Sequence, residues 1–145
     1  MSATSDRRAA VARIEQDLGA LFARIRVSWR EAAATVHPDL QPLGYRVLSA
    51  VASGKATSAS EIIDRLQTDK SAISRQVRQL EEFGLLESRP DPDDRRARVL
   101  EATDLAHERV AAARRDYEAR LADRLEGWSP GDLEQVSALL RDLAR

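Results

Sequence analysis

The chain has 145 residues, with 23 basic residues against 24 acidic ones and no cysteine. This length allows one domain with its own hydrophobic core, so folding requires neither disulfides nor a metal. The lack of cysteine excludes a disulfide framework, a cysteine zinc site and a thiol nucleophile. No apolar run approaches the roughly 18 residues that a membrane span needs, and the N-terminal residues do not form an apolar signal segment. We therefore expect a soluble, cytoplasmic protein without a membrane partner.

The first part of the chain has the periodicity of two helices. Helix-favouring residues dominate the composition, and only 4% of residues are aromatic. Apolar residues from Val11 to Trp29 follow a 3-4-3-4 spacing, which predicts a long first helix. It should end before Pro38, because the residue preceding a proline is pushed out of the helical conformation. A second helix, with apolar residues between 43 and 51, should stop near Gly54.

Two further helices follow, joined by a tight connection. Ser58 with Glu61 three residues later has the pattern of a capping box and predicts a short helix. The next helix should extend from about Asp69 to Phe83 and end at Gly84. At about 100° per residue, its apolar residues lie on one side and its basic and hydroxyl residues on the other. The residues of this second side are Lys70, Ser71, Ser74, Arg75 and Arg78.

A hairpin and two more helices complete the predicted elements. Residues 85–89 and 98–102 are short strand candidates on either side of a polar, proline-broken tip. Thr103 is a good cap for a long helix, and Ser129 followed by proline predicts the start of a last one. The fold class is therefore mainly α with a small β-hairpin wing, a winged helix-turn-helix with flanking helices.

The order and spacing of these blocks resemble the MarR family of bacterial transcription regulators. The resemblance covers residues 58–105 and rests on three motifs and a cap. They are Asp-Lys-Ser-Ala-Ile-Ser-Arg-Gln-Val-Arg-Gln-Leu-Glu at 69–81, Phe-Gly-Leu-Leu-Glu-Ser-Arg at 83–89, Pro-Asp-Pro-Asp-Asp-Arg-Arg at 90–96, and Thr103. Two positions depart from the family pattern, because Ala102 replaces the usual leucine and Ala106 the usual glycine. Both concern packing at the joint between strand and helix.

The resemblance implies a homodimer that binds double-stranded DNA at a pseudo-palindromic operator. Its DNA-binding region is expected at residues 39–103, between an N-terminal dimerisation helix at 6–38 and C-terminal dimerisation helices at 104–145. Continuous apolar stripes on the terminal helices agree with a dimer, since such stripes need a partner surface. The alternative is that the leucines of residues 133–143 fold back onto their own chain.

Basic and hydroxyl side chains of the recognition helix and wing are the candidate DNA contacts. Arginine can bind guanine O6 and N7 together, and we expect Ser71, Ser74 and Arg75 nearest the bases. Lys70 and Arg78 are better placed for phosphates. In the family, the wing arginine corresponding to Arg96 enters the minor groove and the aspartate corresponding to Asp94 holds it. The neighbouring phosphate candidates are Arg95 and Arg98.

The resemblance also implies an effector, often an aromatic acid or phenol, bound near the junction of the first helix and the winged helix. The residues that could contact such an anion are Trp29, His37, Tyr45 and Arg46. Ordinary core packing of Trp29 and Tyr45 is the alternative interpretation. With two histidines and no cysteine, a metal sensor is disfavoured, and we expect no cofactor.

A ligand-released repressor is therefore the leading hypothesis for function. The alternative is a winged-helix module that binds another protein instead of DNA, but such modules tend to lose the basic face. An enzyme is not expected, because no catalytic triad pattern, phosphate loop or metal-spaced cluster occurs. Residues 41–102 hold ten basic and ten acidic residues, so any field that attracts DNA must be local.

Overall fold

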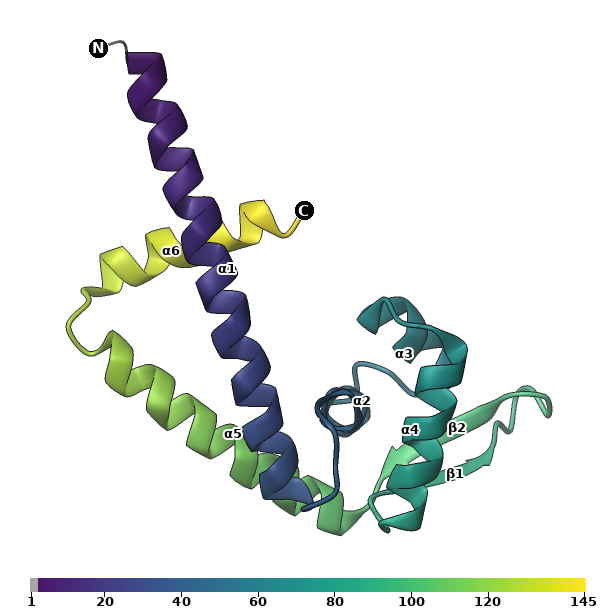
Figure 1. Cartoon of the computed structure of the whole chain (residues 1–145). Helices are drawn as coiled ribbons and strands as arrows, with labels where there is room; N and C mark the ends of the chain where they lie inside the picture. Colours follow the sequence, from purple (N-terminus) through teal and green to yellow (C-terminus); the bar gives the residue numbers. More distant parts are fainter. Residues whose placement is uncertain (1–2) are drawn as a thin grey trace. The chain divides into compact units, whose positions relative to one another are not determined.

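A computed structural model describes residues 3–145 and contains helices and one two-stranded sheet (Figure 1). The helices are α1 (Ala3–Val36), α2 (Pro42–Ala52), α3 (Ala59–Leu66), α4 (Lys70–Glu82), α5 (Asp104–Leu125) and α6 (Pro130–Leu143), and the strands are β1 (Leu86–Pro90) and β2 (Arg98–Ala102). The predicted fold class is confirmed. The chain forms two compact units, of which the first ends at Arg114 and the second is Arg115–Arg145. None of the described helices is long and apolar enough to span a membrane.

Helices α1 and α2 end where the sequence predicts. Helix α1 stops at Val36, two residues before Pro38. Helix α2 begins at Pro42, where a missing N–H costs nothing, and it is followed by Gly54 at φ +73°. The buried residues of α2, with the C-terminal turns of α1, form the centre of the core in the first unit.

Side-chain caps fix the starts of α3 and α4. The Ser58 hydroxyl accepts a hydrogen bond from Glu61 N at 3.2 Å, as the capping box predicts. The return bond is displaced by one residue, because Glu61 Oε2 accepts from Thr57 N at 2.9 Å. At the start of α4, Asp69 Oδ1 accepts from Ala72 N at 2.8 Å. Between the two helices, Gln67 adopts a left-handed conformation with φ 51°, which makes the turn tight.

The apolar side of α4 is buried against α2 and α3. Ile73 and Leu80 are completely buried, and Gln76 between them is nearly so. Helices α2 and α4 approach closely at Gly44, where a Cβ atom would lie 2.5 Å from Leu40 Cδ1 and 2.7 Å from Gln76 Oε1. A larger residue at this position would therefore require the Leu40 and Gln76 side chains to move.

The hairpin is antiparallel, with Leu86 opposite Ala102 and Pro90 opposite Arg98. Leu100 N in β2 donates to Thr57 O at 2.8 Å, so the segment before α3 is bonded to the second strand of the hairpin. This bond fixes the position of the hairpin relative to α3.

Thr103 joins the end of α4 to the start of α5. Its hydroxyl donates to Gly84 O at 2.8 Å and accepts from Ala106 N at 3.2 Å, so the predicted cap is confirmed. Ala106, one of the two departures from the family pattern, is completely buried at this joint.

Replacing Thr103 should destabilise the first unit. Thr103→Ala removes both hydrogen bonds and leaves two backbone groups without partners, so the free energy of unfolding should fall by about 1 to 2 kcal/mol. Urea denaturation followed by circular dichroism measures this change. Thr103→Ser keeps the hydroxyl and serves as the matched control. Equal stability of the alanine and serine variants would contradict the cap.

Candidate nucleic-acid interface

The outer side of α4 carries every recognition-helix residue that the sequence singles out. These residues, all exposed, are Lys70, Ser71, Ser74, Arg75 and Arg78. No acidic residue occurs between positions 70 and 80, so three cations stand on this side without a carboxylate of the same helix segment among them. Burial of Ile73 and Leu80 on the opposite side determines this orientation.

Aspartates organise the tip of the wing through backbone bonds. Asp94 Oδ1 accepts from Arg96 N at 3.0 Å, and Asp94 O accepts from Ala97 N at 3.0 Å. Asp91 Oδ1 accepts from Asp93 N at 2.9 Å in a similar turn. The expected contact of Asp94 with Arg96 is thus made to the arginine backbone. Arg95 and Arg96 are exposed at the tip.

Arg98 is held back against the first strand of the hairpin. Its Nε and Nη2 atoms donate to Ser88 Oγ at 3.1 and 3.0 Å, and Nη2 also donates to Ser88 O at 3.0 Å. These bonds place the guanidinium beside the body of the hairpin, whereas Arg95 and Arg96 belong to its tip.

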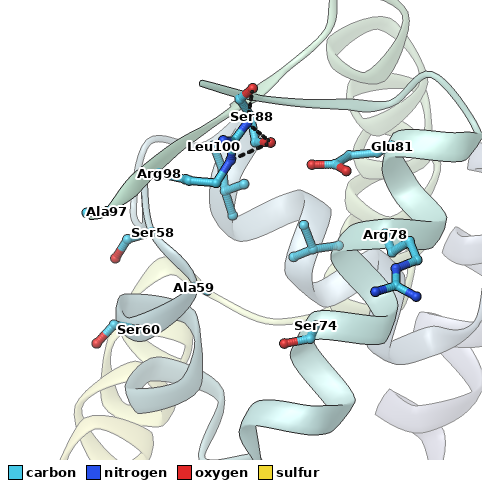
Figure 2. Close-up of a pocket in the computed structure, with 11 residues that line it drawn as sticks. Ser58, Ala59, Ser60, Ser74, Arg78, Glu81, Ser88, Ala97, Arg98 and Leu100 are labelled. Atoms are coloured by element: carbon cyan, nitrogen blue, oxygen red, sulfur yellow. Dashed lines mark hydrogen bonds between the residues drawn. The ribbon is translucent and has the colours of Figure 1, made fainter. Parts of the chain in front are cut away.

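A groove separates α4 from the hairpin (Figure 2). Its volume is about 590 Å³. The start of α3 forms one wall with Ser58 and Ser60, and α4 faces it with Ser74. Polar and charged lining also comes from Arg78, Glu81, Ser88 and Arg98. Ser74, Arg78 and Arg98 are among the DNA contacts predicted from the sequence. Ser58 and Ser60 are not, because the pattern around Ser58 indicates only a helix cap.

A second hollow lies on the other side of α4. Its volume is about 330 Å³, and its lining joins Gln41, at the start of α2, to Arg75 and Arg78. Gln41 Oε1 accepts from Gln76 Nε2 at 3.4 Å. Sequence reasoning missed Gln41, since the 35 residues between it and Gln76 give no local signal of their proximity.

Three of the four candidate effector residues line one cavity of about 390 Å³ within the first unit. They are Trp29, Tyr45 and Arg46, and the Arg46 guanidinium lies 4.4 Å from the centre of the Trp29 ring. Burial raises the pKa of the Tyr45 hydroxyl, while its hydrogen bond with Ser49 and the charge of Arg114 act in the opposite direction. Tyr45 also belongs to the core and Trp29 packs against it, as the alternative interpretation of these two residues predicts.

His37 does not line this cavity. Its ring stacks on Phe83 at the end of α4, with centroids 3.7 Å apart and an angle of 12° between the planes. Its Nδ1 atom accepts from Asp39 N at 3.1 Å. His37 therefore connects the end of α1 to the end of α4.

A short helix, a tight turn, a helix with an exposed basic side and a hairpin define a winged helix-turn-helix. The model of the MarR family matches residues 39–97, which contain all of these elements except the second strand. Over this segment the chain is similar to the MarR family.

One curated relative and two solved structures show the extent of the similarity. The chain is 28% identical over 88 residues to YdgJ, an uncharacterised HTH-type transcriptional regulator of Bacillus subtilis. This match covers 61% of the chain and only 52% of YdgJ. The MarR-family transcription regulator SP03579 is 22% identical, with a TM-score of 0.87 over 99% of this chain and 94% of that one.

The second structure is that of a MarR-family regulator from Listeria monocytogenes in complex with a 26mer DNA. It is 16% identical and superposes with a TM-score of 0.75. The match covers 89% of the present chain and 85% of the Listeria protein. At these identities the structural matches establish the fold.

Loss of the Asp94 carboxylate should loosen the wing tip without unfolding the core. Asp94→Ala removes the acceptor for Arg96 N, so amide hydrogen exchange of Arg96 should accelerate by about fivefold to twentyfold. The melting temperature should not change, because the tip buries little apolar surface. Asp94→Asn, which keeps an acceptor oxygen, should exchange nearly as slowly as the wild type. An unchanged rate in the alanine variant would contradict the turn.

Proposed function

We propose that this chain is a homodimeric transcription regulator that binds double-stranded DNA at a pseudo-palindromic operator and represses until a small ligand releases it. The observation that carries the proposal is the exposed basic side of α4 next to a wing with two exposed arginines at its tip. In winged helices the recognition helix occupies the major groove and the wing reaches the minor groove. The Listeria regulator, which has the same fold, is complexed with a 26mer DNA, and this supports DNA binding by the present chain.

The groove between α4 and the hairpin can hold a phosphate backbone when the protein binds DNA in this way. A duplex with α4 in one groove and the wing in the next must lay one phosphate backbone between them. The Ser60 hydroxyl and Arg78 line that passage and can bind phosphate oxygens. We assign Ser71, Ser74 and Arg75 to the bases, Lys70, Arg78, Arg95 and Arg98 to phosphates, and Arg96 to the minor groove.

The alternative, a winged-helix module that binds protein, lacks a comparable supporting observation. The basic side of α4 is retained and exposed, and DNA offers the matching negative charge at both α4 and the wing.

Removing one arginine from α4 and one from the wing should abolish operator binding. Each arginine contact is worth about 1 to 3 kcal/mol per site, so Arg75→Ala with Arg96→Ala should weaken binding by at least about 100-fold. Gel shift and fluorescence anisotropy with the promoter fragment of the chain's own gene measure this loss.

The matched control is Arg145→Ala, which removes the same kind of charge at the C-terminus and should leave affinity within about twofold. For the wild type, about 6 to 10 phosphate contacts per dimer predict a loss of about 10³ to 10⁵ in affinity between 50 and 200 mM salt. Unchanged affinity of the double variant would reject the DNA-binding assignment.

The terminal helices support dimerisation. In α6 no residue is buried, and four of its apolar side chains are 45–55% exposed. They are Val136, Leu139, Leu140 and Leu143. Helix α1 likewise exposes Val11, Ile14, Leu21 and Phe22. A second copy of the chain can cover these apolar surfaces, which would otherwise remain in water.

A charge in the apolar stripe of α6 should prevent dimerisation. Leu140→Glu places a carboxylate in the proposed interface, where burial without a partner is costly. Analytical ultracentrifugation should find a monomer at about 10 μM, whereas the wild type should sediment as a dimer. Gln135→Glu, on the polar side of the same helix, should remain dimeric. A dimeric Leu140→Glu variant would exclude this stripe from the interface.

The cavity at Trp29 is the proposed effector site. It offers an aromatic ring, the Tyr45 hydroxyl and the Arg46 guanidinium to an anionic aromatic or phenolic ligand. The volume of about 390 Å³ is within the usual range for small-molecule sites. Its position between α1 and α2 lets a ligand act on the helix that supports α4.

A further inference from the structure

We propose that the cavity at Trp29 selects a ligand with a doubly charged anionic group, such as a phosphate monoester, over a singly charged aromatic acid of the same shape. This inference rests on the proposed effector role of the cavity and narrows the class of its ligand. The inference concerns only the charge of the ligand, and none of the residues proposed to contact DNA takes part in it.

The lining of the cavity is the reason for expecting two charges. Four cationic side chains line it, and no carboxylate does; these side chains are Arg46, Lys55, Arg65 and Arg114. In a chain whose net charge is −1, such a local excess requires an explanation. Arg46, Lys55 and Arg65 form no ion pair with any residue of the described range 3–145.

The remaining lining suits a phosphate with an organic substituent. Ser49 and Ser53 place hydroxyl groups in the wall, and guanidinium groups can bind phosphate oxygens in pairs. Arg46 is already held over the Trp29 ring, which reduces the entropy lost when it binds an anion. Trp29, Ala50 and Leu66 supply apolar surface for the substituent.

Electrostatics distinguishes the two ligand classes. The attraction between the cluster and a ligand grows in proportion to the ligand charge, so a second negative charge strengthens binding at every cation. Part of the cavity is open to solvent and salt, which reduces the gain. We therefore expect an advantage of about tenfold or more for the doubly charged ligand.

Phenyl phosphate and phenyl sulfate provide the test, because they share shape and differ in charge. A phosphate monoester carries nearly two negative charges above pH 7, since its second pKa is near 6, whereas the sulfate ester carries one. Isothermal titration of the full-length protein at pH 7.5 and 50 mM salt should give at least about tenfold tighter binding for phenyl phosphate.

Variants locate the binding in this cavity. Arg65→Gln removes one of four cations and should lower the preference about twofold, and Arg65→Lys, which keeps the charge, should restore most of it. Arg145→Gln removes a charge elsewhere and should change nothing. Melting temperatures of these variants report whether each one is folded.

The outcomes separate this inference from the proposed function. Equal affinity for both esters, or no binding of either, overturns the inference. A lower preference in Arg78→Gln but not in Arg65→Gln would assign binding to the groove beside α4 and also overturns it. If phenyl phosphate binds as expected but leaves operator affinity unchanged, the doubly charged site stands and the effector role fails.

Discussion

Burial of one side of α4 is the constraint on which the interface depends. Ile73 and Leu80 are completely buried, and Gly44 allows α2 to approach close enough to enclose them. Since successive helix residues are separated by about 100°, a rotation of α4 by one residue would turn Ser74 or Arg78 toward the core. The apolar residues therefore determine which side chains are available to a ligand, although they contact no ligand themselves.

Elements with a local signal could be predicted from the sequence, and contacts between distant segments could not. Ser58 and Thr103 each accept a capping bond from an N–H group three residues later, so a motif is sufficient to identify these caps. Arg98 was predicted as a phosphate contact, and its bonds to Ser88 could not be predicted, because they depend on the hairpin register. Gln41 reaches α4 only through the packing of α2, which no local pattern encodes.

His37 illustrates the same limit for the effector residues. Its position near the end of α1 suggested that it accompanies Trp29, and eight residues along a helix change both height and direction. In the structure the chain has already left α1 at this point, and the ring stacks on Phe83. Trp29, Tyr45 and Arg46 do meet at one cavity because α1 and α2 pack side by side.

The carboxylates that bring the net charge close to zero have different structural roles. Asp69, Asp91 and Asp94 accept hydrogen bonds from backbone N–H groups at a helix start and in the wing. Glu101 pairs with Arg89 within the hairpin. The three aspartates therefore bind backbone N–H groups near the cations, and Glu101 pairs with an arginine that is not a candidate DNA contact. Electrostatic attraction can thus be local while the net charge stays near zero, which limits non-specific binding.

Helix α2 links the two proposed sites physically. One part of it, with Arg46 and Ser49, lines the cavity beside α1, and another, at Gly44, lies against Gln76 of α4. A ligand shifts a conformational equilibrium only if it binds one arrangement better than the other. Arg46 of α2 and Arg65 of α3 both line the cavity, so a doubly charged anion would favour the arrangement that brings them together. Because α3 and α4 are the two halves of the DNA-reading unit, drawing α3 toward α2 would alter the surface offered to the operator.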